Sequence, residues 1–112
     1  MITLYGIKNC DTVKKARRFL ESNNKEYQFH DFREDGLDKK QLTGWVEQLT
    51  WEAVVNKRST TWRNLSDKDK TITTNAQAIK LLLANPTLIK RPVVEKDKTI
   101  LIGFKENEFK EL

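Results

Sequence analysis

Cys10 is the only cysteine of the chain, and its position suits nucleophilic chemistry. It follows a short β-rich segment, residues 1–5, and precedes a helical pattern that starts at Thr12. Unpaired N–H groups and the helix dipole at such a position favour negative charge, and thiolate is the reactive form of cysteine. Lys8 and Lys14 add positive charge nearby. The pattern therefore predicts a reactive thiolate at Cys10.

Three further expectations concern the same stretch. A lone cysteine in a small protein is often a buried, inert side chain, which is the alternative interpretation of Cys10. Asp11 or Thr12 is expected to cap the helix by accepting hydrogen bonds from N–H groups of its first turn. Gly6 is expected to break the strand after Tyr5.

A second candidate stretch, residues 57–63, is rich in cations and hydroxyl groups. Guanidinium and hydroxyl groups of such a loop can hold an oxyanion. A solvated loop in which Trp62 packs inward explains the stretch equally well. The only histidine, His30, falls on the polar face of a predicted strand, and we interpret it as a solvated or hydrogen-bonded structural residue.

Composition limits the class of protein. The chain has 112 residues, of which 33% are charged and 38% hydrophobic, as in one globular domain. It has no apolar run of about 18 residues and no signal peptide, and a single cysteine fits a reducing cytoplasm. One histidine argues against a zinc site. The net charge is +5, but acidic residues are interspersed with the basic ones, so we expect no direct binding to nucleic acid. We take a monomer as the default oligomeric state.

The order of the predicted elements indicates an α/β protein. A strand, a helix and a second strand at residues 27–32 form a βαβ unit with parallel strands. Helices follow at residues 38–49 with Asp38 as N-cap, near Trp51, and from Thr74 or Asn75 to Ala84. An antiparallel hairpin closes on residues 99–102, and a terminal helix spans 105–112. We predict one domain, residues 1–112, with a mixed sheet covered by helices on both faces and a helical insertion at about 37–85.

Three separated motifs carry a resemblance to a known family. They are residues 5–12 around Cys10, residues 58–63, and residues 88–92, which end in Arg91-Pro92. Together they resemble the arsenate reductase (ArsC) family, in its YffB branch beside the Spx regulators. The resemblance covers essentially the whole chain. It implies a thioredoxin-like, three-layer α/β/α fold with a four-stranded mixed sheet.

The resemblance also assigns roles to individual residues. Cys10 matches the nucleophile of the family, and Arg91 matches an arginine that faces it and binds the oxyanion. Pro92 is expected to follow a cis bond. Arg58 matches a second oxyanion-binding arginine, with Lys57 as the competitor for that role. Lys8, Thr12 and Lys14 complete the groups expected beside the substrate.

The chain departs from the arsenate reductase pattern at three places. Gly6 stands where the family has a histidine, Val13 where it has a serine, and residues 103–105 lack a third arginine. Val13 also removes the second cysteine of a C-x-x-C switch. We therefore expect a single-cysteine thiol reductase, with no tightly bound cofactor, whose adduct is resolved by an external thiol such as glutathione. The alternative is a non-catalytic, Spx-like regulator that binds RNA polymerase.

Overall fold

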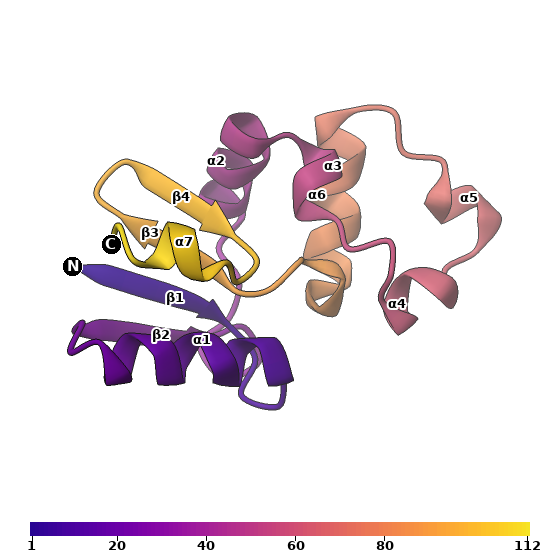
Figure 1. Cartoon of the computed structure of the whole chain (residues 1–112). Helices are drawn as coiled ribbons and strands as arrows, with labels where there is room; N and C mark the ends of the chain where they lie inside the picture. Colours follow the sequence, from indigo (N-terminus) through magenta and orange to yellow (C-terminus); the bar gives the residue numbers. More distant parts are fainter. The chain divides into compact units, whose positions relative to one another are not determined.

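The computed structural model describes residues 1–112, which form two compact units. The first unit combines Met1–Gly36 with Arg91–Leu112, and the second is Leu37–Lys90. Figure 1 shows the elements of both units along the chain. The helical insertion expected at about 37–85 falls within the second unit.

A four-stranded mixed sheet forms the centre of the first unit. Its strands are β1 (Ile2–Gly6), β2 (Tyr27–Asp31), β3 (Val93–Lys96) and β4 (Thr99–Ile102), in the order β2-β1-β3-β4. β1 pairs in parallel with β2, whereas β3 pairs antiparallel with both β1 and β4. The predicted α/β class, the parallel βαβ unit and the closing hairpin are therefore confirmed.

Apolar residues at alternate strand positions and helical spacing build the core of this unit. Helices α1 (Asp11–Ser22) and α7 (Glu106–Phe109) pack their apolar side chains on Ile2, Leu4 and Val94 of the sheet. Side chains two apart on a strand share one face, and those three or four apart on a helix share one stripe. The cluster comprises Ile2, Leu4, Val13, Ala16, Leu20, Val94 and Phe109. This packing fixes the start of α1 against the end of β1.

Three boundaries in the first unit differ from the sequence predictions. Gly6 is the last residue of β1 rather than a break after it. The predicted caps, Asp11 and Thr12, are wrong, because both lie inside α1 and the extended Cys10 is its N-cap. The sequence predicts a terminal helix over residues 105–112, whereas α7 is a single turn, Glu106–Phe109.

The second unit is helical. Its elements are α2 (Lys39–Leu49), α3 (Trp51–Val54), α4 (Thr60–Arg63), α5 (Asp67–Lys70), α6 (Asn75–Ala84) and a 3₁₀ turn, η1 (Pro86–Leu88). Asp38 accepts a hydrogen bond from Lys40 N–H, so the predicted N-cap is confirmed. The helix expected from Thr74 or Asn75 starts at Asn75, and Thr74 caps it by accepting from Gln77 N–H. The stretch expected as a loop, residues 57–63, contains the one-turn helix α4, which Ser59 caps. The one-turn helix α5 is capped by Ser66.

Buried apolar side chains and backbone pairing hold the second unit together. Its buried residues include Leu42, Trp45, Val46, Val54, Ala78, Leu82, Leu88 and Ile89. Val55 and Ile89 form an isolated antiparallel bridge, and Asn56 N–H donates to the Leu88 carbonyl at 2.9 Å. None of the helices of the chain has the length and apolar character needed to span a bilayer.

Candidate active site

Cys10 occupies the N-cap position of α1. Its backbone is extended, with φ −125° and ψ 123°, and its carbonyl accepts the first helical hydrogen bond from Lys14 N–H at 2.9 Å. Its thiol is partly exposed and makes no capping hydrogen bond. An N-cap side chain points toward the unpaired N–H groups of the first turn. The structure thus places the sulfur where a negative charge is favoured.

The surroundings of the sulfur favour its thiolate form. Burial acts to raise the pKa of the Cys10 thiol, because a charge is costly away from water. The N–H group of Val13, the Arg91 guanidinium and the N–H group of Thr12 act in the opposite direction and outweigh burial. The net result is a pKa below the ordinary value of the thiol.

Arg91 lies two residues before the start of β3, in the same unit as Cys10. It acts on the thiol both as a hydrogen-bonding group and through its positive charge. The Arg91–Pro92 peptide bond is cis, which confirms the conformation expected for Pro92. A fixed guanidinium beside a thiolate can also bind an anionic group of a substrate in bidentate fashion.

The loop that precedes Cys10 is attached to the end of β2. Asp31 Oδ2 accepts a hydrogen bond from Lys8 N–H at 3.3 Å, and its Oδ1 accepts one from Arg33 N–H at 2.7 Å. Asp31 is 3% exposed. Burial acts to raise the pKa of its carboxyl, but the N–H groups of Arg33, Lys8 and Glu34 lower it below the ordinary value.

Gly6 and Val13 are in close contact at the base of this loop. A methyl group added at Gly6 would lie 2.7 Å from Cγ2 of Val13, closer than van der Waals contact allows. Val13 is fully buried, so its side chain cannot simply turn away into solvent. The two departures from the arsenate reductase pattern therefore depend on each other: Val13 leaves no room for a side chain at position 6.

The other predicted groups of the first unit lie in different settings. Lys8 Nζ donates to both carboxylate oxygens of Glu34 at 3.0 Å, which raises the pKa of the lysine. Both side chains of this pair are about 60% exposed, so the pair contributes little stability. The backbone N–H of Thr12 helps to lower the pKa of the Cys10 thiol, and Lys14 is exposed. Binding of an anion by Lys8, Thr12 and Lys14 stays a prediction.

Lys57 and Arg58 belong to the second unit, between α3 and α4. Lys57 Nζ lies 5.4 Å from the ring centroid of Trp51 and 5.5 Å from that of Trp62, so its ammonium is held by two indole rings. Arg58 is exposed, and its backbone N–H donates to Asn56 Oδ1 at 3.1 Å. The resemblance names Arg58, with Lys57 as its competitor, as the second anion-binding cation. This role stays a prediction.

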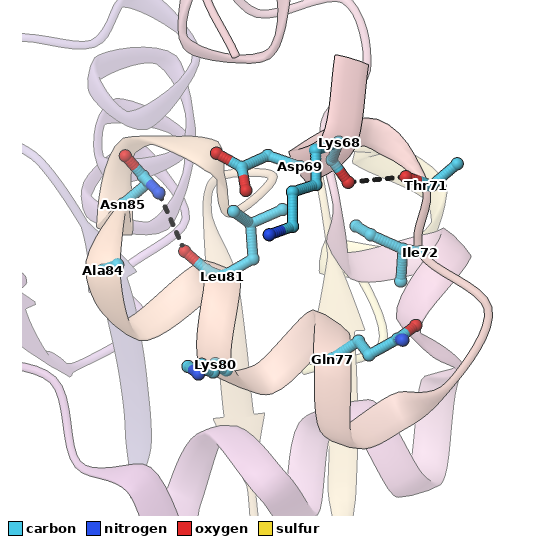
Figure 2. A pocket seen from close by; sticks show the side chains of 9 residues that line it. All are labelled: Lys68, Asp69, Thr71, Ile72, Gln77, Lys80, Leu81, Ala84 and Asn85. Atoms are coloured by element: carbon cyan, nitrogen blue, oxygen red, sulfur yellow. Dashed lines mark hydrogen bonds between the residues drawn. The ribbon is translucent and has the colours of Figure 1, made fainter. Parts of the chain in front are cut away.

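A pocket of about 460 Å³ lies in the second unit, between α5 and α6. Figure 2 shows the side chains that line it. Ile72 and Leu81 supply apolar lining, and Lys68 and Lys80 supply charge. Asn85 Nδ2 donates to the Leu81 carbonyl at 3.1 Å. The pocket contains no cysteine, so the candidate thiol chemistry stays with Cys10.

Sequence reasoning missed Asp31. It stands at the end of an alternating aromatic strand, directly before the turn of residues 32–35. An acidic residue at that place is usually exposed, so nothing in the sequence indicates that Asp31 is buried and accepts a hydrogen bond from Lys8 N–H. His30 was interpreted as structural, and its Nε2 lies 2.7 Å from the Gly36 carbonyl, consistent with that interpretation.

A four-stranded mixed sheet, with a helix-capping cysteine after its first strand and a cis-proline before its third, defines a thioredoxin-like protein with one thiol. The model of the ArsC family matches residues 5–112. The chain therefore belongs to the ArsC family.

Individual relatives agree with this assignment. The chain is 53% identical over 109 residues to an uncharacterised protein of Haemophilus influenzae, which covers 97% of this chain and 96% of the relative. A solved structure of the YffB (PA3664) protein is similar with a TM-score of 0.95 at 41% identity, over 99% of this chain and 97% of that one. The global transcriptional regulator Spx of Streptococcus mutans is 29% identical over 98% of this chain and 81% of its own length. The expected kinship with the YffB and Spx proteins is confirmed.

Proposed function

We propose that this ArsC-family protein is a glutathione-dependent thiol reductase in which Cys10 is the single nucleophile. The observation that carries the proposal is the thiol of Cys10 at the N-cap of α1, with a lowered pKa and Arg91 beside it. A lowered pKa raises the fraction of thiolate at a given pH, and thiolate is the nucleophilic form of cysteine.

In the first step, the Cys10 thiolate attacks the glutathione sulfur of a mixed disulfide. The new Cys10–glutathione disulfide forms as the old sulfur–sulfur bond breaks, and the substrate leaves as a thiolate that takes a proton from water. Arg91 binds a carboxylate of the glutathione moiety, which orients its sulfur toward Cys10. The first-turn N–H groups stabilise the Cys10 thiolate before attack.

In the second step, an external glutathione thiolate attacks the glutathione sulfur of the adduct. Oxidised glutathione is released, and Cys10 leaves as the thiolate that the helix N-terminus stabilises. In sum, one external glutathione and one mixed disulfide give the free substrate thiol and oxidised glutathione, half of which comes from the mixed disulfide. The external thiol is required because the chain has no second cysteine to resolve the adduct.

The contact of Gly6 with Val13 favours a disulfide substrate over arsenate. Valine and glycine offer no side-chain hydrogen-bond donor to a tetrahedral oxyanion, and Val13 blocks the addition of a side chain at position 6. A disulfide sulfur needs no such donors. Reduction of arsenate is therefore expected to be slow compared with reduction of a glutathione mixed disulfide.

A coupled assay tests the proposal. The purified protein is given the mixed disulfide of glutathione and 2-mercaptoethanol, with reduced glutathione, glutathione reductase and NADPH. We expect NADPH consumption that depends on the protein and is lost in Cys10→Ser. The Ser22→Ala variant, at an exposed position of the same helix, is the matched control and should keep full activity. Absence of turnover in the wild type, or full turnover in Cys10→Ser, would overturn the proposal.

A second candidate function is a regulator that binds RNA polymerase. The similarity to Spx of Streptococcus mutans over 98% of this chain favours it. The two candidates differ in their need for the thiol. Stoichiometric binding of purified RNA polymerase by both the wild type and Cys10→Ser, together with an inactive coupled assay, would favour the regulator.

A further inference from the structure

We propose that Asp31 is a positioning residue, which ties the β1–α1 loop to the end of β2 and thereby keeps Cys10 at the N-cap of α1. This role rests on the proposed function of Cys10 as nucleophile, because Asp31 affects the reaction only by holding Cys10 in place.

The two oxygens of the buried Asp31 carboxylate serve different partners. Oδ1 accepts from the N–H groups of Arg33 at 2.7 Å and Glu34 at 3.4 Å, within the turn that Asp31 itself begins. Oδ2 accepts from Lys8 N–H at 3.3 Å, 23 residues away in sequence. A buried polar group that loses its partner is costly. The two oxygens of Asp31 therefore restrain both the turn after β2 and the β1–α1 loop.

The hydrogen bond from Lys8 N–H to Asp31 extends the attachment between β1 and β2 into the β1–α1 loop. Pairing of β1 with β2 ends at Gly6 and Asp31, and Phe32 N–H donates to the Gly6 carbonyl at 2.9 Å. Beyond that point the backbone ladder stops, and the Asp31 side chain supplies the next link. Lys8 is two residues before Cys10, so this link restrains the last free part of the loop.

The exposed ion pair between Lys8 and Glu34 spans the same two segments. Both of its side chains are about 60% exposed and screened by water, so it restrains the loop weakly. The buried carboxylate of Asp31 is the stronger attachment, because hydrogen bonds to a charged group are stronger than neutral ones and water does not compete with them.

Asp31→Asn separates positioning from two other possible roles. The amide keeps one acceptor oxygen and replaces the other with a donor, so one set of N–H partners is lost. Positioning predicts that the inflection of Cys10 alkylation against pH rises by about half a unit or more, because the loosened loop lets the sulfur leave the first-turn N–H groups. A direct effect of the Asp31 charge predicts a lower inflection, and a role confined to the turn predicts no shift.

The experiment measures the rate of Cys10 alkylation by iodoacetamide from pH 5 to pH 10 in the wild type, in Asp31→Asn and in Asp35→Asn. Asp35 is the matched control, because its Oδ2 accepts from Asp31 N–H at 2.9 Å within the same turn and touches no part of the β1–α1 loop. A raised inflection in Asp31→Asn with an unchanged one in Asp35→Asn is the expected result. An unchanged or lowered inflection in Asp31→Asn would overturn the proposal.

Hydrogen exchange of the wild type tests the proposal even where Asp31→Asn does not fold. The Lys8 amide lies outside β1 and α1, so only the Asp31 carboxylate protects it. We expect exchange at least tenfold slower than for an unstructured amide, and exchange at the unstructured rate would overturn the proposal. Neither readout needs a substrate, so an inactive coupled assay would remove the proposed function and leave this result intact.

Discussion

Cys10 and Arg91 illustrate how a single side chain gains reactivity from its neighbours. Burial alone would raise the pKa of the thiol and make it inert. Two first-turn N–H groups and one guanidinium reverse that effect. The sequence placed the cysteine at a helix start, but the balance between burial and these groups is a property of the folded chain.

Replacing Arg91 with glutamine should therefore make the thiol less acidic. We expect the inflection of Cys10 alkylation against pH to rise by about one unit, since an adjacent opposite charge typically shifts a pKa by that order. The control is Arg18→Gln, at an exposed position of α1. An inflection that is the same in Arg91→Gln as in the wild type would show that the N–H groups alone lower the pKa.

The start of α1 shows where prediction at the level of elements succeeded and failed. Hydrophobic spacing located the helix and both flanking strands to within a residue or two, because their apolar faces are fixed by the core. Capping preferences predicted Asp11 or Thr12 as the N-cap, whereas packing of α1 on the sheet places Cys10 at the N-cap position. Four-residue helices such as α4 and α5 are too short to show a helical period of apolar residues. Asp31 could not be singled out from the sequence, because its hydrogen bond with Lys8 joins residues 23 positions apart.

The packing of β1 against α1 predicts a coupled effect of Gly6 and Val13. Gly6→Ala should lower the free energy of unfolding by about 1–3 kcal/mol, because its methyl group would lie 2.7 Å from Val13. Val13→Ala should cost about 2 kcal/mol through lost burial. In the double variant the clash is absent, so we expect a loss smaller than the sum of the two.

Urea unfolding of the four proteins measures this coupling. A difference of about 0.5–3 kcal/mol between the double variant and the sum is expected for residues in contact. Strict additivity would mean that the strand and the helix move apart to accommodate the new methyl group.

At the scale of the molecule, the stability of the chain should depend on pH through Asp31. The pKa of this carboxyl is lower in the folded protein than the ordinary value of 3.8. Its ionised form thus contributes stability that is fully present above pH 3.8 and is lost as the pH falls through the lower, folded value.

Asp31→Asn should flatten the acid part of the stability profile. Below about pH 4, the free energy of unfolding of the wild type should fall more steeply with decreasing pH than that of the variant. Urea unfolding at a series of pH values measures both slopes. Glu26→Gln, at an exposed position, is the control and should follow the wild-type curve. Parallel curves for wild type and Asp31→Asn would contradict the expectation.

The division into two units also separates the natural optical probes of the chain. All three tryptophans, Trp45, Trp51 and Trp62, belong to Leu37–Lys90, whereas both tyrosines and the thiol belong to the first unit. Tryptophan fluorescence therefore follows melting of the helical unit, and the accessibility of Cys10 follows melting of the sheet. Overlaying the two denaturation curves, without any added label, shows whether this small chain loses its structure in one cooperative transition or in two.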